Sequence, residues 1–219
     1  MRTLNLYNNI HLRKIYFSPV YMVLEFMFFY VFIPFIAVSY LDGWYKIIPL
    51  LLIAGFFFLI LRIDPHFDKR VLYRINKKHL RRSLPRIIVI SILLIWFTFW
   101  IFPGLFFQFP LENFKAYVVT LFLYPLISVI PQELSYRVYF FHRYRKLVPE
   151  KYLLMLSNAI IFGLTHWIYG NWVAPIATFL VSWIFIFNYL KSKSLLNVSI
   201  EHYIYGFIMF TIGFGYFFS

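Results

Sequence analysis

The chain has 219 residues, of which 62% are apolar, 24% are aromatic and only 13% are charged. Soluble globular chains contain about 25% charged residues, so this composition excludes a disordered chain, a collagen-like chain and an ordinary cytosolic enzyme. The formal net charge is +13, and the absence of cysteine excludes disulfides, thiolate metal ligands and a cysteine nucleophile. Apolar stretches of about 20 residues recur along the whole length and predict a polytopic membrane protein.

Hydropathy predicts an all-α membrane helix bundle with about seven spans, since the apolar runs are too long for strands and lack period-two alternation. In chain order, the predicted spans cover about residues 17–38, 44–61, 86–107, 114–146, 152–167, 172–190 and 195–218. No internal repeat and no cleavable targeting peptide is evident. We therefore expect residues 1–219 to form a single integral membrane domain.

The distribution of basic residues predicts the orientation of the bundle. Of the 21 Lys and Arg residues, 18 precede the first span or lie in the connections after spans two, four and six. Lys46 and Lys115 fall on the other side, and Arg137 lies within span four. By the positive-inside rule, the N-terminus is cytoplasmic and the C-terminus is outside. The basic charge thus reflects membrane topology, and the expected partner is the lipid bilayer, with no nucleic acid.

The long basic connection over residues 62–85 has its own pattern. Its apolar residues approximate one helical face, with cations on the other: Phe67, Val71, Leu72, Ile75, Leu80 and Leu84. This periodicity predicts an amphipathic helix at the cytoplasmic interface, held by anionic lipid headgroups. The alternative is a solvated basic loop.

Few ionisable residues lie at membrane depth, and each needs a partner or a function because its burial costs at least about 2.5–3.5 kcal/mol. They are Glu25, Glu133, Arg137, His166, Glu201 and His202. Glu133 and Arg137 are four residues apart, so they share a helix face and can form a structural salt bridge. For Glu25 we expect a bundle cation such as Arg137 as the partner. Glu201 and His202 are adjacent and therefore face different neighbours.

Three of these residues are predicted to lie in one layer of the membrane. Glu133 lies about 15 residues before the turn that joins spans four and five, and His166 lies about 17 residues after it. His202 is nearer the midplane, about ten residues beyond its own turn. One carboxylate with two imidazoles is compatible with a two-His-one-carboxylate metal site or with water activation by the carboxylate. The ligands come from three helices without a compact metal motif, so we favour the metal-free chemistry and expect no cofactor.

The same residues carry a resemblance to a known family. Gln132-Glu133 followed by Arg137, Phe162 followed by His166, and His202 followed by Gly206 resemble three ordered motifs. These are Glu-Glu-x-x-x-Arg, Phe-x-x-x-His and His-x-x-x-Asn of the CAAX protease and bacteriocin-processing (CPBP) family of intramembrane glutamic endopeptidases. The resemblance covers residues 114–219, which form the expected catalytic core, and the longer pattern looks like a bacterial subgroup.

The resemblance implies a glutamate that activates water, a first histidine that positions this water, and a second histidine and an asparagine that stabilise the oxyanion. The expected catalytic residues are Glu133, His166 and His202, and the supporting residues are Gln132, Arg137, Phe162 and Gly206. Two positions depart from the family. Gln132 stands where the family has its first glutamate, generally taken as the base, and Gly206 stands where it has asparagine. A glutamine does not accept a proton at neutral pH, and a glycine has no side-chain donor.

Two functions are therefore expected from the sequence. The first is a metal-independent endopeptidase of the bacterial cytoplasmic membrane, which hydrolyses a peptide bond of a peptide or membrane protein in or near the bilayer. The alternative is a non-catalytic membrane relative that binds a peptide or a partner, for example in bacteriocin immunity or maturation.

Overall fold

The computed structural model describes residues 14–218, and all regular structure in this range is helical. The α-helices are α2 (Pro19–Met27), α3 (Ile33–Tyr40), α4 (Ile47–Ile63), α5 (Lys77–Ile101), α6 (Gln108–Glu112), α7 (Phe114–Tyr124), α8 (Ile130–Glu133), α9 (Phe140–Tyr144), α10 (Lys151–Thr165), α11 (Val173–Ser192) and α12 (Leu195–Thr211). Three π-helical segments are η1 (Phe28–Phe32), η5 (Pro125–Val129) and η6 (Leu134–Tyr139). The 3-10 segments are η2 (Gly43–Lys46), η3 (Lys69–Leu72), η4 (Pro103–Leu105), η7 (His166–Tyr169) and η8 (Phe214–Phe218). The predicted all-α fold is confirmed.

Within the described chain, six helical segments are long and apolar enough to cross a membrane. They are Pro19–Tyr40, Gly43–Ile63, Lys69–Ile101, Phe114–Tyr144, Lys151–Tyr169 and Val173–Ser192. They correspond to the first six predicted spans, and the seventh corresponds to α12, which has 17 residues. The protein is thus an integral membrane helix bundle, as predicted.

The last helix is shorter than predicted because the chain turns at Gly213. This glycine has φ +89°, and a Cβ atom added there would lie 1.7 Å from the backbone oxygen of Leu105. Only glycine tolerates both the left-handed conformation and the close backbone approach. Helix α12 therefore ends at Thr211, and η8 follows as a separate segment.

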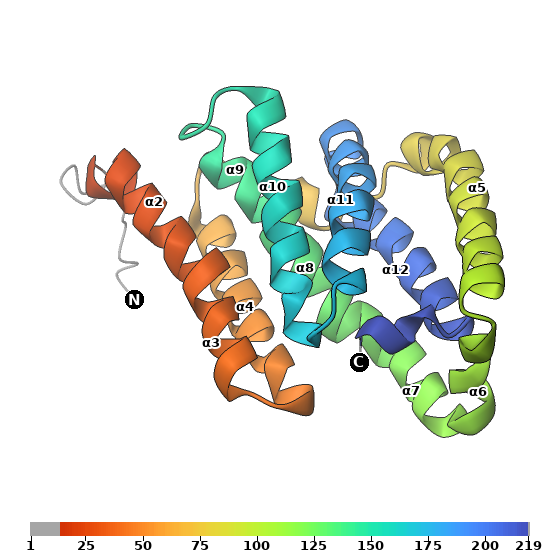
Figure 1. Cartoon of the computed structure of the whole chain (residues 1–219). Coiled ribbons are helices and arrows are strands. Elements are labelled where there is room, and N and C mark those ends of the chain that lie inside the picture. The colour runs from red at the N-terminus through yellow and green to blue at the C-terminus, as the bar shows by residue number, and fades with distance from the viewer. Residues whose placement is uncertain (1–13, 219) are drawn as a thin grey trace.

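The fourth span carries most of the expected site residues and is not a regular α-helix. It runs through α7, η5, α8, η6 and α9, and it passes diagonally across the bundle from the lower right to the upper left (Figure 1). Pro125 and Pro131 have no N–H to donate, which favours local departures from the α-helical pattern. A π-helical turn holds more residues than an α-helical turn, so it changes the direction in which later side chains point.

The first two spans pack against this irregular helix through aromatic side chains. The Phe57 and Tyr139 rings stack with centroids 3.7 Å apart, and the Tyr30 hydroxyl donates a hydrogen bond to the Ser135 oxygen at 2.7 Å. Phe57 is fully buried, and Tyr30 and Tyr139 are nearly so. The first two spans thus pack closely on the fourth span.

The expected single amphipathic helix over residues 62–85 is wrong in extent. Only the short segment η3 forms in its first half, and its second half belongs to α5, which begins at Lys77. The backbone N–H of Asn76 donates to Asn197 Oδ1 at 2.8 Å, and Asn197 Nδ2 donates back to the backbone oxygen of Asn76 at 3.0 Å. Asn76 is also the N-cap residue of α5, since its side chain accepts from the His79 N–H at 3.0 Å, so these bonds fix the start of α5 against α12.

The apolar residues of this connection also do not share one lipid-facing surface. Phe67 and Val71 are buried in the core, whereas Ile75 and Leu84 are about half exposed. Periodicity alone could not distinguish apolar side chains that face lipid from those that pack on protein.

Glu25 has a different partner from the one expected. Arg143, not Arg137, binds its carboxylate, with Nε to Oε1 at 2.9 Å and Nη2 to Oε2 at 2.8 Å. The Tyr139 and Tyr144 hydroxyls donate to the same Oε1 at 2.9 and 3.1 Å. This buried network joins α2 to the end of the fourth span and leaves Arg137 free to serve the site.

Candidate functional site

Three parts of the chain bring the expected site residues together. The short helix α8 ends with Gln132 and Glu133, η7 begins with His166, and α12 carries His202 near its middle. All four side chains are buried in the interior of the bundle. Residues far apart in the sequence thus meet at one level of the molecule.

A direct hydrogen bond joins Glu133 to His202. Glu133 Oε1 lies 2.7 Å from His202 Nδ1, and the Glu133 side chain is completely buried. An ionised carboxylate only accepts hydrogen bonds, so Nδ1 carries the hydrogen. When the imidazole is neutral, its Nε2 therefore holds a lone pair. The ring of His202 also stacks on Phe185, with centroids 4.5 Å apart, which fixes its plane.

Arg137 supports the opposite oxygen of the same carboxylate. Its Nε lies 3.3 Å from Glu133 Oε2, its Nη1 donates to Asn158 Oδ1 at 2.6 Å, and its guanidinium lies 4.4 Å from the centroid of the Phe162 ring. Asn158 Nδ2 in turn donates to the backbone oxygen of Tyr136 at 2.6 Å. Sequence reasoning missed Asn158, although an amide in the middle of an apolar span is a usable signal for a buried polar contact.

His166 has a defined tautomer. Its Nδ1 lies 2.7 Å from the backbone oxygen of Phe162, and a carbonyl oxygen only accepts, so Nδ1–H is the donor. The neutral ring therefore presents an unprotonated Nε2. The Phe162 ring contacts His166 with centroids 4.7 Å apart, which holds the imidazole in place. The spacing of the predicted Phe162–His166 pair thus has a structural purpose.

A cavity of about 290 Å³ lies beside these imidazoles. Its polar lining residues are Tyr124, Ser128, Gln132, His166, Tyr169, Thr178, His202 and Tyr205. The rest of the lining is mainly apolar and includes Ile90, Leu94, Leu180, Ile184 and Met209. We expected Glu133 and Arg137 to line it too, but neither is among its lining residues. They lie behind the wall because side chains of neighbouring helical residues point about 100° apart.

Gln132 is the residue of the first motif that faces the cavity. Its Nε2 donates to Ser128 Oγ at 2.9 Å, whereas its buried Oε1 has no hydrogen-bond partner in the described chain. The position at which the related family has its first glutamate is therefore the position that meets the cavity.

Gly206 lies in the cavity wall for a steric reason. A Cβ atom at this position would lie 2.3 Å from Cε1 and 2.4 Å from the hydroxyl oxygen of Tyr124. An asparagine side chain does not fit unless Tyr124 moves. The sequence showed no sign of this contact, because Tyr124 and Gly206 are on different helices and outside any shared motif.

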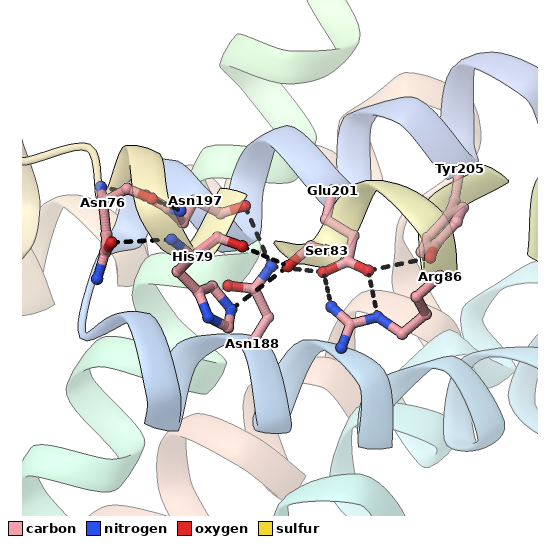
Figure 2. Close-up of polar contacts among 8 residues, drawn as sticks. All are labelled: Asn76, His79, Ser83, Arg86, Asn188, Asn197, Glu201 and Tyr205. Atoms are coloured by element: carbon pink, nitrogen blue, oxygen red, sulfur yellow. Dashed lines mark hydrogen bonds and ion pairs between the residues drawn. The ribbon is translucent and has the colours of Figure 1, made fainter. Parts of the chain in front are cut away.

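Glu201 belongs to a separate polar network, as its angular separation from His202 predicted. Arg86 of α5 binds its carboxylate with Nε to Oε1 at 3.0 Å and Nη2 to Oε2 at 2.7 Å. Asn188 of α11 donates to Oε2, and the Tyr205 hydroxyl donates to Oε1 (Figure 2). This network joins three helices and leaves Glu201 fully occupied.

No group of three or more His, Cys, Asp or Glu side chains that could hold a metal ion is found within residues 14–218. The buried carboxylate pairs with one imidazole and one guanidinium, and the second imidazole bonds to a backbone oxygen.

Fold and site together define a helical integral membrane protein with a carboxylate–imidazole pair beside an apolar cavity. Residues 113–208 match the family model described as type II CAAX prenyl endopeptidase Rce1-like. The three motifs lie inside this range, so the predicted resemblance to CAAX-protease-like proteins is confirmed. The family is a protease family, which supports an intramembrane peptidase at family level. No curated protein and no solved structure matches the chain.

Proposed function

We propose that this protein is a metal-independent intramembrane endopeptidase that uses Glu133, His166 and His202 to hydrolyse a peptide bond within the bilayer. The observation that carries the proposal is the 2.7 Å contact between the Glu133 carboxylate and His202, whose ring lines an apolar cavity. A buried ionisable pair is costly in a membrane protein and is a functional-site hypothesis by default.

In this proposal Glu133 acts through His202 and does not touch the water itself. The carboxylate is completely buried, and one oxygen faces His202 while the other faces Arg137. A carboxylate on Nδ1 holds the imidazole in the tautomer whose Nε2 accepts a proton, and it stabilises the imidazolium that forms. Arg137 pairs with the other carboxylate oxygen at 3.3 Å and holds Glu133 in place against His202.

His166 supplies the second acceptor in the cavity. Its Nδ1–H is engaged by the Phe162 oxygen, so its Nε2 accepts the other hydrogen of the attacking water. A water that donates to both imidazoles is oriented with its oxygen lone pair toward the substrate carbonyl. This accounts for the presence of two histidines in the same tautomer.

The proposed reaction has two proton transfers. The water transfers one proton to His202 Nε2 as its oxygen bonds to the carbonyl carbon, and the carbonyl electrons move to oxygen. When this tetrahedral intermediate collapses, the C–N bond breaks and His202 Nε2–H donates its proton to the leaving nitrogen. The products are a carboxyl group and an amine, and His202 returns to its neutral state.

The cavity favours an apolar substrate segment. Its walls carry Ile90 and Leu94 of α5 and Leu180 and Ile184 of α11. We propose a peptide with an apolar or lipid-modified residue next to the bond that is cleaved. The description of the matched family as a prenyl endopeptidase makes a prenylated C-terminal peptide the first probe.

A specific observation also favours the second candidate, a non-catalytic membrane relative that binds a peptide. The cavity-facing residue of the first motif is Gln132, which has no proton acceptor at neutral pH. If a carboxylate at position 132 is essential for hydrolysis, the same cavity only binds its peptide.

One experiment separates the two candidates. Purified protein in liposomes is given quenched fluorescent peptides, with and without a C-terminal prenyl group, and cleavage is followed for wild type and three variants. We expect an active wild type, a moderate loss for Gln132→Ala, and a loss of about 10²–10⁴-fold for Glu133→Gln, because only the latter removes the charge that stabilises the imidazolium.

The third variant, Gln132→Glu, provides the opposite outcome. An inactive wild type with an active Gln132→Glu would show that position 132 must hold the base and that the natural chain is a non-catalytic relative. Thermal unfolding of each variant in the same liposomes verifies that a loss of cleavage is not a loss of fold.

A further inference from the structure

The space beside Gly206 is filled by an aromatic ring from another helix. An added Cβ atom at position 206 would lie 2.3–2.6 Å from Cε1, the hydroxyl oxygen and Cζ of Tyr124. The hydroxyl end of the Tyr124 ring therefore occupies the place that a side chain at position 206 would take. In the related family this position carries an asparagine, so a hydroxyl group stands where an amide is expected.

Tyr124 is held so that its hydroxyl group remains in the cavity. It is the last residue of α7, directly before the π-helical segment η5, and it lines the cavity with Gln132 and His202. Its ring packs edge-on against Phe210 with centroids 5.2 Å apart and against His202 with centroids 6.1 Å apart. These contacts restrict the ring, and they place it beside the imidazole that acts on the water in the proposed function.

The hydroxyl of Tyr124 differs from those of three buried tyrosines that each have a protein partner. Tyr30 donates to a backbone oxygen, Tyr139 donates to Glu25, and Tyr205 donates to Glu201. The Tyr124 hydroxyl has no such protein partner among the described residues. A phenol that lines a cavity with its donor unused is available to a ligand, since buried hydroxyls otherwise find a partner.

We propose that the Tyr124 hydroxyl donates a hydrogen bond to the carbonyl oxygen of the substrate and stabilises the oxyanion, in place of the side chain that Gly206 lacks. This inference rests on the proposed peptidase function. The phenol keeps its proton throughout, so it adds no step to the reaction. It strengthens its hydrogen bond only as negative charge develops on the oxygen, which lowers the barrier. The pairing of a glycine at 206 with a tyrosine at 124 then conserves the donor by moving it to another helix.

The first test is Tyr124→Phe, which keeps the ring against Gly206 and removes only the donor. We expect kcat to fall about 10²–10³-fold, with KM changed less than about threefold and the unfolding temperature unchanged. The substrate is the quenched peptide that wild type cleaves in liposomes. Tyr203→Phe is the matched control: this ring is 6.4 Å from Tyr124 but is not part of the cavity lining, and its removal should leave kcat unchanged.

The second test moves the donor back to α12. Gly206→Asn alone should lower both activity and stability, because its side chain overlaps Tyr124. Tyr124→Ala should lose the activity because it removes the donor. The double variant Tyr124→Ala/Gly206→Asn should be at least about tenfold more active than Tyr124→Ala, since an amide can donate to the same oxygen. If the Tyr124 ring only fills space, the double variant should be no more active than Tyr124→Ala.

The outcomes separate this inference from the function on which it rests. If wild type cleaves the peptide, Glu133→Gln does not, and Tyr124→Phe has the wild-type kcat, the donor role is rejected and the peptidase function stands. If wild type cleaves neither peptide, the peptidase function is rejected, and the oxyanion role of Tyr124 is rejected with it.

Discussion

The guanidinium of Arg137 is a charged group buried with few hydrogen bonds. It is completely buried in a membrane bundle, yet its Nε and Nη2 atoms have no hydrogen bond of good geometry in the described chain. The stabilisation comes from the ion pair with Glu133, the bond to Asn158 and the aromatic face of Phe162. Each charge is stabilised by the other, so we expect that removing one of them destabilises the protein more than removing both.

We predict that Arg137→Met lowers the free energy of unfolding by about 3–5 kcal/mol, since it leaves the Glu133 charge buried without its cation. Thermal or chemical denaturation of the purified protein in detergent measures the loss. The double variant Glu133→Gln/Arg137→Met should recover much of it, because no net charge remains buried. Arg81→Met, at an exposed position of α5, is the control and should change stability by less than about 0.5 kcal/mol.

At the scale of elements, the polar contacts that join α5 to the bundle lie in its first half. Its polar contacts are those of Arg86 with Glu201 and of the Asn76 cap with Asn197, both on α12 (Figure 2). Further along, Ile90 and Leu94 line the cavity. Helix α5 thus forms one wall of the cavity, and the network around Glu201 holds this wall in place.

We predict that Glu201→Gln weakens the attachment of α5, because the buried carboxylate that binds Arg86 loses its charge. Hydrogen exchange should increase in the first four turns of α5, over residues 77–91, while α10 keeps its protection. Glu112→Gln is the matched control, since Glu112 is exposed and bonds only to Gln108 on α6. Equal exchange in α5 for both variants would contradict the role of the network.

For the whole molecule, the basic connections define two ends of the bundle. The α9–α10 turn, the α11–α12 turn and the start of α5 lie at the same end (Figure 1). This arrangement agrees with the positive-inside pattern, from which we predict that this end is cytoplasmic. Lys115, at the start of α7, lies at the opposite end.

The absence of cysteine allows a direct test of this orientation. We predict that Lys115→Cys is labelled by a membrane-impermeant maleimide on intact bacterial spheroplasts, whereas Arg145→Cys is labelled only after permeabilisation. Both positions are exposed, so accessibility to reagent depends on the side of the membrane. The reverse pattern would show that the basic end is outside.

The sequence was sufficient for the parts of the structure that the bilayer dictates. A span needs about 20 apolar residues and excludes unpaired charge, so the span positions and six of the buried ionisable groups could be recognised without tertiary information. The buried Arg143 and Asp64, near the ends of their helices, were not recognised. The rise per residue placed Glu133 and His166 at similar depth but left His202 nearer the midplane, about 8 Å from Glu133 in depth. The structure nevertheless brings Glu133 and His202 within 2.7 Å.

Only the tertiary structure decided how these groups are arranged around the helices. Whether Gln132 or Glu133 faces the cavity depends on a rotation of about 100° in a span with π-helical turns, which no periodicity rule resolves. The partner of Glu25 and the contact of Tyr124 with Gly206 depend on which helices are neighbours. Depth in the membrane follows from counting residues along one helix, whereas direction and neighbourhood follow from the packing of all helices together.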